Sequence, residues 1–548
     1  MPRDDKVQKL EFSDEFLMGA AERRFESGDY LGALTMLNKR GGMYLPSADA
    51  SALYGDIYES LGLWQQCEDA WFRFLDTCNE ADFAEGYEGL SVAFANLGDE
   101  LRAELYYRKA YSLVNGIPEM DDMPIQEPQK PQLRIIHSSD GSLGDPELLR
   151  KGVLFVKVGA LSKAREVLGE IPPESIDYPS AKGLSAMCLL LSGDTENAAK
   201  ECRELLSTHP DNIHALTTYC AVLGAQNKKE EAKEIAEKLA LIQTDSMEDL
   251  YRIATALCET GLDEAACEKF SILIKKQPYD DNFLWFHAVS AQRTGKTEEA
   301  IASLETLTTV YPRKEVARYY LEHLRTGEIG EMSYFYRLPD AEYKAISGFF
   351  LMLDSFSKKE SEVFADTDEL LRNVRLAFDQ DDGHDTQLQL LAARVCVNSR
   401  SDNILREILL DCEVEESVKM NILKELAMRN EDDSFGVVVC NFYRDMFFHK
   451  LDLGPRKKKA FLQAFAEVYV RYALVGEENE SKLVCAAEDV NRILADIGME
   501  ELFEEQAALS AVILREARLV GEERSIDRTA GAFDANVDTV KSILNYLM

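Results

Sequence analysis

Residues capable of chemistry are present in this sequence, but their spacing matches no catalytic or metal-binding pattern. The run Asp379–Asp385 reads DQDDGHD, yet an EF-hand calcium loop needs Gly at its sixth position and Glu at its twelfth, where this run has Gly383 fifth and Leu390 twelfth. The eleven cysteines form no CxxC pair, and the seven histidines are scattered. His287 falls inside a helical pattern that favours packing over catalysis. The motifs HExxH, GxxxxGKS/T, GxSxG and GxGxxG are absent. We therefore expect no enzyme, no catalytic residue, no cofactor and no metal.

Charge and composition restrict the class of partner. The 548 residues include 61 Lys and Arg against 98 Asp and Glu, which gives a formal net charge of −37. Such a surface repels nucleic-acid phosphates and anionic lipids on average, so we expect basic or apolar protein partners. The N-terminus has no apolar signal segment, and no run approaches the about 20 apolar residues of a membrane helix. With cysteines at packing positions, these features predict a cytoplasmic protein that does not enter a membrane.

A fixed interval organises residues 145–312. Five turn residues recur every 34 positions, and a small residue follows each of them by five positions. The turn residues are Gly159, Gly193, Asn227, Gly261 and Gly295, and the small residues are Ala164, Ala198, Ala232, Ala266 and Ala300. Asparagine suits a turn because it tolerates the left-handed backbone conformation. A period of 34 residues that contains two helical patterns predicts a helix-turn-helix solenoid.

Three less regular copies of this unit precede it within residues 1–115, with turn residues Gly28, Gly62 and Gly98. Residues 116–145 then interrupt the pattern, because four prolines in this stretch oppose helix formation. We expect a linker between two repeat arrays. Two roles remain open for it: a flexible insertion, or a tether that lies in the groove of its own solenoid.

On these residues the sequence resembles the tetratricopeptide repeat family. That family places small residues where two helices approach, a glycine at the turn, and bulky residues between neighbouring pairs. The second copy carries this pattern on Tyr54, Gly55, Tyr58, Gly62, Cys67 and Trp71. The resemblance implies an all-α, right-handed solenoid whose helix pairs stack, because no pair buries its apolar side alone. It also implies that the first helix of each pair lines a concave, protein-binding surface.

When the inner positions of the family's repeats are assigned to this sequence, the resemblance implies two concave surfaces of different character. In the first array the inner residues are acidic: Asp49, Asp56, Glu59, Glu85 and Glu88. In the second array they are mainly apolar and form our candidate partner-binding site: Leu149, Val153, Met187, Leu190, Leu191, Tyr251, Trp285, Val289 and Arg293. An exposed apolar stripe of this length is typical of a binding surface. The alternative is that the linker or the C-terminal domain of the same chain covers it.

One ligand class of the family is disfavoured. Members that bind a peptide C-terminal carboxylate use Lys, Asn and Arg along the groove. The matching positions here are Asp56, Val92, Val153 and Ala221. We therefore expect a protein or peptide partner, but no carboxylate-clamp ligand.

Beyond residue 328 the interval of 34 is lost while helical patterns continue. Residues 329–452 resemble a HEAT-like helical region. Within it, the β-branched and aromatic residues of 435–451 predict either a β-hairpin or a short buried helix. For residues 453–548 we predict a C-terminal helical module. The basic run Arg456–Lys459 near its start suits a solvated face, a contact with an anionic ligand or a contact with the acidic repeats. Residues 511–544 resemble a helix-turn-helix and the last helices of the cyclin-like repeats of transcription factor B. Asp534 replaces the usual turn glycine, however, and residues 521–548 hold five acidic residues against three basic ones.

The predicted fold is an all-α, right-handed TPR-type α-solenoid followed by an irregular helical C-terminal domain, with the hairpin as its one β element. The predicted organisation is repeats one to three in 1–115, a Pro-rich linker in 116–145, repeats four to eight with a capping helix in 146–328, the helical region 329–452 and the module 453–548. We predict a non-enzymatic scaffold that binds a peptide or protein surface along the concave groove. The alternative is a regulator that senses a partner through its repeats and contacts nucleic acid through the C-terminal helix-turn-helix. The acidic net charge of the chain disfavours nucleic acid as a ligand.

Overall fold

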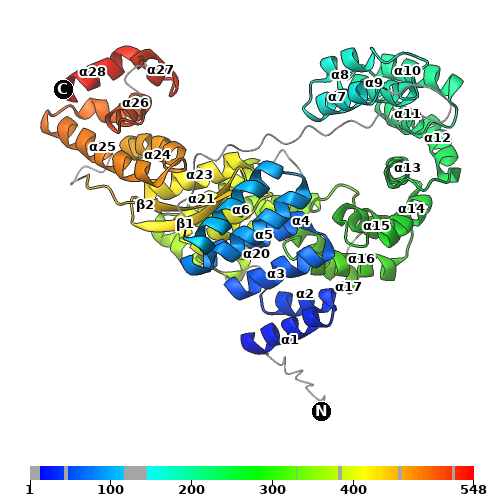
Figure 1. Cartoon of the computed structure of the whole chain (residues 1–548), viewed down its shortest axis with the longest axis horizontal. Coiled ribbons are helices and arrows are strands. Elements are labelled where there is room, and N and C mark those ends of the chain that lie inside the picture. Colours follow the sequence, from blue (N-terminus) through cyan, green and yellow to red (C-terminus); the bar gives the residue numbers. More distant parts are fainter. Residues whose placement is uncertain are drawn as a thin grey trace. The chain divides into compact units, whose positions relative to one another are not determined.

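The computed structural model describes residues 13–41, 47–116, 145–328, 330–380, 386–453, 459–520 and 525–547. They fall into two compact units, one within residues 1–125 and 338–548 and the other within residues 126–337. Figure 1 shows both units as helical, with a two-stranded sheet in the first, so the predicted fold class is confirmed. Most of the linker 116–145, of the calcium-like run 379–385 and of the basic run 456–459 lies outside the described residues.

The second unit is the regular repeat array. Its helices pair in sequence order from α7 with α8 to α15 with α16, and α17 packs on the last pair. The bounds are α7 Pro146–Lys157, α8 Leu161–Leu168, α9 Tyr178–Leu191, α10 Thr195–Thr208, α11 Ile213–Ala225, α12 Lys229–Leu241, α13 Met247–Glu259, α14 Asp263–Lys276, α15 Asp281–Arg293, α16 Thr297–Val310 and α17 Glu315–Thr326. All five predicted turn residues are left-handed, including Asn227 with φ 59°. The five alanines of the period are at most 3% exposed, because each lies where two helices approach closely.

The N-terminal repeats of the first unit form three helix pairs. Their helices are α1 Asp14–Glu26, α2 Tyr30–Lys39, α3 Ala48–Leu61, α4 Trp64–Thr77, η2 Glu80–Asp82, α5 Phe83–Leu97 and α6 Glu100–Asn115. Trp71 of α4 is 4% exposed and fills the space between α3 and α5. A Cβ atom on Gly55 of α3 would lie 2.6 Å from Trp71 Cε2, and one on Gly89 of α5 would collide with the same ring. These two helices can therefore approach the indole only where they carry glycine.

We expect Gly55→Ala to lower the free energy of unfolding of the first unit by about 1–3 kcal/mol, because the added methyl group overpacks the indole contact. Urea unfolding followed by circular dichroism measures the change. Gly348→Ala in α18 (Asp340–Asp354) is the matched control, since a Cβ atom there meets nothing within 4 Å. The control should be neutral or stabilising by up to about 1 kcal/mol, as alanine is the better helix former. Equal stability of Gly55→Ala and the wild type would contradict the close approach.

The C-terminal half of the first unit is an irregular helical assembly with one hairpin. Its elements are α18, α19 Lys358–Ser361, η3 Glu362–Phe364, α20 Asp368–Phe378, α21 Thr386–Ser399, α22 Asp402–Leu410, α23 Glu416–Arg429, β1 Asp433–Val439, β2 Phe442–Phe448, α24 Lys459–Ala473, α25 Glu477–Asp496, η4 Glu500–Glu504, α26 Gln506–Glu516, α27 Ile526–Gly531 and α28 Val537–Leu547. β1 and β2 pair antiparallel, with Val439 opposite Phe442. Cys440 and Asn441 form the two-residue turn at φ 52° and 60°, the positive values that a tight hairpin turn of this kind requires. The predicted hairpin is confirmed, and the alternative of a short buried helix is wrong.

The hairpin turn joins the C-terminal half to the N-terminal repeats. The hydroxyl group of Tyr106 in α6 donates to the carbonyl oxygen of Asn441 at 2.9 Å, and Arg102 Nη2 donates to that of Cys440 at 3.1 Å. The ring of Phe442 lies 6.4 Å from that of Tyr106, between centroids. These contacts connect residues more than 330 positions apart in sequence. The first repeat array is therefore completed by a distant part of the chain.

The described chain ends in two short helices, α27 and α28, within the segment for which we predicted a helix-turn-helix. Asp534 occupies the turn between α27 and α28 with φ 54°, so aspartate takes the left-handed position where glycine is usual. Ala530 and Val540 are fully buried and hold the two helices together. In the part of the chain that the structure describes, none of the helices is both long and apolar enough to cross a bilayer.

Candidate functional site

The first helices of the pairs in the second unit lie next to one another. α7 contacts α9, α9 contacts α11, and α11 contacts α13. Tyr251 of α13 continues the row, since its ring packs against Phe283 and Phe286 of α15 at centroid distances of 5.4 and 6.4 Å. All nine candidate binding residues belong to these helices. We call the surface formed by α7, α9, α11, α13 and α15 the groove.

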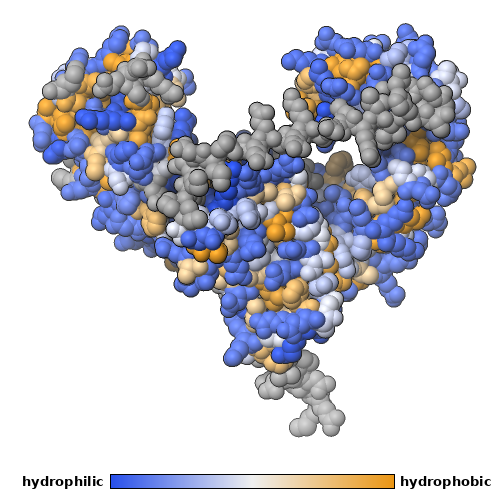
Figure 2. Space-filling view, in the orientation of Figure 1, coloured by the Kyte–Doolittle hydropathy of each residue, from blue (hydrophilic) through white to orange (hydrophobic). Residues whose placement is uncertain are grey.

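The α7–α9 part of the groove is apolar and partly exposed. Leu149 and Leu190 are half-buried and pack against the core clusters beneath them. Val153 and Met187 are half-buried as well, and Leu191 is 61% exposed. Figure 2 shows hydrophobic residues among hydrophilic ones over this end of the unit. Apolar side chains are thus available to a partner at this end.

The α13–α15 part of the groove is closed. Trp285 is 3% exposed and Val289 is fully buried, while Tyr251 and Arg293 are half-buried. The connector that follows α17 turns back over α15 and contacts this part through its main chain. We call residues 330–336 the groove segment.

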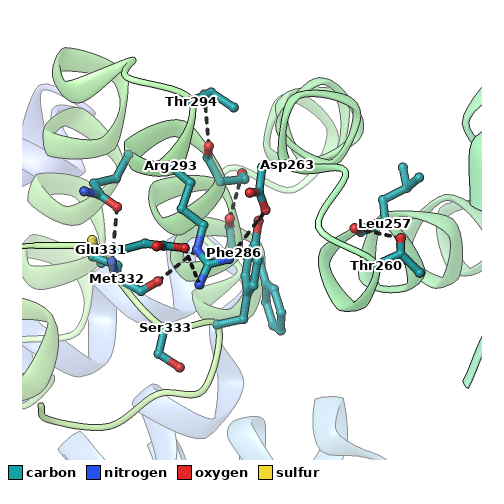
Figure 3. Close-up of polar contacts among 12 residues, drawn as sticks. Leu257, Thr260, Asp263, Phe286, Arg293, Thr294, Glu331, Met332 and Ser333 are labelled. Atoms are coloured by element: carbon teal, nitrogen blue, oxygen red, sulfur yellow. Dashed lines mark hydrogen bonds and ion pairs between the residues drawn. The ribbon is translucent and has the colours of Figure 1, made fainter. Parts of the chain in front are cut away.

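Side chains of α15 hold the groove segment by its main chain. Gln292 Nε2 donates to the carbonyl oxygen of Gly330 at 3.1 Å, and Gln292 Oε1 accepts from the Met332 N–H at 3.1 Å. Arg293 Nε donates to the carbonyl oxygen of Met332 at 2.9 Å, and its Nη2 lies 3.1 Å from Glu331 Oε1. Figure 3 shows Arg293 reaching both residues. Bonds to main-chain atoms can hold a non-helical segment whatever side chains it carries.

Tyr334 is the anchor of the groove segment. The indole N–H of Trp285 donates to its carbonyl oxygen at 3.1 Å, and its hydroxyl group donates to Asp263 Oδ1 at 2.6 Å. Its ring stacks on Phe286 at 5.8 Å between centroids, and the Arg293 guanidinium lies 4.7 Å from the ring centre. Burial raises the pKa of Tyr334, so the hydroxyl group keeps the proton that it donates. Tyr336 adds an edge contact with Trp285, with centroids 4.7 Å apart.

The sequence left open whether the chain covers its own groove. Over α13–α15 it does, through the connector directly after α17. The aromatic run Tyr334-Phe335-Tyr336 was the available signal, since three aromatic residues outside any helix need a surface to pack on. The binding role of the nine candidate residues stays a prediction.

The inner residues of the first array remain acidic and exposed. Asp49, Asp56, Glu59, Glu85 and Glu88 are all exposed to solvent. Partial burial and the charges of Glu59 and Glu85 raise the pKa of Asp56. These carboxylates give this surface a strongly negative charge.

One group of possible metal ligands lies among the described residues. Ligand atoms of Cys267, His287 and Glu299 are all within 4.8 Å of one another. Both ring nitrogens of His287 are already in hydrogen bonds, Nε2 with Ser271 Oγ at 3.0 Å and Nδ1 with Ser303 Oγ at 2.8 Å. Lys296 Nζ also lies 3.9 Å from Cys267 Sγ, where its charge opposes a cation. This arrangement fits packing better than metal binding, as the helical pattern around His287 indicated.

The C-terminal helix-turn-helix presents little positive charge. Lys541 of α28 lies 3.9 Å from Asp527 Oδ1 of α27, and Asp538 stands in the first turn of α28. A nucleic-acid reader normally presents several free basic groups to phosphate. Nucleic-acid contact stays an untested alternative.

Comparisons with known proteins agree with the repeat pattern. A family model described as "Tetratricopeptide repeat" matches residues 189–257. The "TPR repeat-containing protein YvcD" of Bacillus subtilis (strain 168) is 24% identical over 276 residues, which are 48% of this chain and 55% of that protein. The chain thus spans about half the length of this curated relative. A solved structure named "Structure of Naa15/Naa10 bound to HypK-THB" aligns over 97% of this chain and 99% of that chain at 12% identity, but its TM-score of 0.16 supports no argument.

Proposed function

The chain is a tetratricopeptide repeat protein, and we propose that its second repeat array captures an extended peptide segment of a protein partner along the groove. Proteins built from this repeat are in general non-enzymatic interaction scaffolds. The coarser role therefore follows from the repeats themselves, and the groove and its ligand are the proposal.

One observation carries this proposal: side chains of the groove already hold the main chain of a segment that lies outside any helix or strand, residues 330–336. Gln292, Arg293 and Trp285 all bond to main-chain atoms of residues 330–336. Such contacts depend on main-chain atoms more than on side-chain sequence, so they suit peptide capture in general. The groove is also preformed by packed helices, which reduces the ordering cost of binding.

The exposed end of the groove, over α7–α9, is where a partner would first engage. Leu191 is 61% exposed and is flanked by the half-buried Met187 and Leu190. Apolar side chains of a partner would gain burial here, at roughly 25 cal/mol per Å² of apolar surface removed from water. With a net charge of −37 on the chain, the favoured partner segment is apolar with basic flanks.

Leu191→Glu should weaken peptide binding at least tenfold, because it places a charge on the apolar end of the groove without removing a core residue. Peptides would be selected from a random display library against the wild-type chain and titrated by calorimetry. Leu241→Glu at the end of α12 is the matched control, since Leu241 is 81% exposed but lies on a second helix of a pair. Equal affinities for wild type, Leu191→Glu and Leu241→Glu would refute binding at this surface.

A further inference from the structure

We infer that the groove segment is an internal ligand, and that the α13–α15 part of the groove also accepts a peptide from another molecule with the same chemistry: a carboxylate followed three residues later by a tyrosine. This inference rests on the proposed function and names the ligand class of one part of the groove. Glu331 and Tyr334 are the two residues of the groove segment whose side chains define that class.

The carboxylate preference comes from Arg293. Its Nη2 lies 3.1 Å from Glu331 Oε1, while its Nε is already bound to the carbonyl oxygen of Met332. Glu331 remains 68% exposed, whereas the Arg293 side chain is 22% exposed. The guanidinium is therefore fixed by the groove, and the carboxylate approaches it from solvent. A ligand with a neutral residue at this position would leave Nη2 without its carboxylate, and the guanidinium would keep only the ion pair of Nη1 with Asp263 Oδ1 at 3.8 Å.

The tyrosine preference comes from Asp263 and Phe286. Asp263 Oδ1 accepts the hydroxyl hydrogen bond of Tyr334 at 2.6 Å, and the Phe286 ring stacks against the tyrosine at 5.8 Å. Phenylalanine would keep the stacking and lose the charge-assisted hydrogen bond. A site built around a hydroxyl group discriminates against the analogue that lacks it, because its acceptor loses a short hydrogen bond; Asp263 Oδ1 would keep only its ion pair with Arg293 Nη1 at 3.8 Å. Tyrosine is thus favoured over phenylalanine at this position.

The groove segment has the features of a ligand rather than of a structural core element. Met332 is its buried residue, while Phe335 is 74% exposed and Glu331 68% exposed. Its main chain bonds to side chains of α15 instead of continuing a helix. Tyr334 packs against the core cluster that includes Phe270, but a segment outside helices and strands still opens at a lower free-energy cost than packed helices do. The segment can therefore leave the groove while the helix pairs stay folded.

Tethering explains why the groove segment occupies its site by default. It follows α17 after a short connection, so its effective concentration at the groove is on the order of millimolar. A peptide from another molecule sees an apparent dissociation constant equal to the intrinsic value divided by the open fraction. Weakening the internal segment raises the open fraction and so tightens binding of the external peptide by the same factor.

The test uses a fluorescent peptide with the sequence of residues 330–337, GEMSYFYR, titrated by anisotropy into the full chain. The host variant Tyr334→Ser loses the internal anchor but keeps Asp263, Phe286 and Arg293. We expect it to bind the peptide at least tenfold more tightly than the wild type. Phe335→Ser is the matched host control, because Phe335 is 74% exposed, and it should bind the peptide like the wild type.

Two altered peptides test the named chemistry on the Tyr334→Ser host. Peptides with Gln in place of Glu, or with Phe in place of the first Tyr, should each bind at least threefold more weakly. A thermal melt confirms that the host is folded, and Tyr334→Phe is the milder host if it is not.

The inference is overturned if the peptide fails to bind the folded host, binds it no more tightly than the wild type, or binds without regard to the Glu and Tyr positions. If the library peptides still bind in a manner that depends on Leu191, the proposed function holds even though this inference has failed. Loss of that binding as well would refute the proposed function itself.

Discussion

Arg73→Met should lower the free energy of unfolding of the first unit by about 3–5 kcal/mol, the usual cost of removing one partner from a buried ion pair. Arg73 Nε donates to Asp69 Oδ2 at 2.8 Å, and the two side chains are 7% and 3% exposed. Arg73 Nη2 also donates to the carbonyl oxygen of Glu407 in α22, at 3.3 Å. The substitution leaves the Asp69 carboxylate buried without this cation and removes a bond between the N-terminal repeats and the C-terminal half.

Urea unfolding by tryptophan fluorescence measures this loss. Trp285→Phe provides the background, since Trp64 and Trp71 then report on the first unit alone. Arg24→Met is the matched control, because the Arg24–Asp29 pair in the same unit is 45% and 49% exposed and should contribute less than about 1 kcal/mol. The double variant Asp69→Asn/Arg73→Met should cost less than Arg73→Met, because position 69 then carries no buried charge. A loss below about 1 kcal/mol for Arg73→Met would contradict a coupled buried pair.

The repeat arrays were predictable because their determinants are local. A left-handed turn residue every 34 positions and a buried alanine five positions later specify each pair without reference to the rest of the chain. The hairpin was predictable only as one of two alternatives: its β-branched and aromatic residues favour strands, but the sequence left a short buried helix open until the two-residue turn at Cys440 and Asn441 was seen. Each of these signals depends on residues within one supersecondary element.

Contacts between distant segments were not predictable in this way. Tyr106 and Asn441 are 335 positions apart, and nothing near either residue indicates the other. The groove segment gave a partial signal through its aromatic residues, but its direction back over α15 depends on the tertiary positions of Gln292 and Trp285. One polar feature was also missed, because α4 reads as an amphipathic helix although Glu68, Asp69 and Arg73 are buried in it. Those buried charges pack where the distant C-terminal half covers α4.

Glu68 makes the stability of the first unit depend on pH in a direction opposite to that of most carboxyl groups. It is 4% exposed, and its Oε1 has no hydrogen-bond partner among the described residues. Burial, followed by the charge of Asp69, raises the pKa of Glu68 from 4.5 to about 7, although Arg102 acts the other way. The folded state therefore holds the proton over a range in which the unfolded state has released it. This contribution to stability is complete below about pH 4.5, decreases as the pH rises, and is lost above about pH 7.

Glu68→Gln should accordingly raise the free energy of unfolding at pH 8 by about 3 kcal/mol, since each pKa unit corresponds to about 1.4 kcal/mol and the amide cannot ionise. At pH 4.5 the variant and the wild type should be nearly equally stable, because both side chains are then neutral in the folded state. Urea unfolding from pH 4.5 to 8.5, in the Trp285→Phe background, measures the two curves. Glu59→Gln is the control, since Glu59 is exposed. Parallel curves for Glu68→Gln and the wild type would show that the buried carboxyl group does not control this pH dependence.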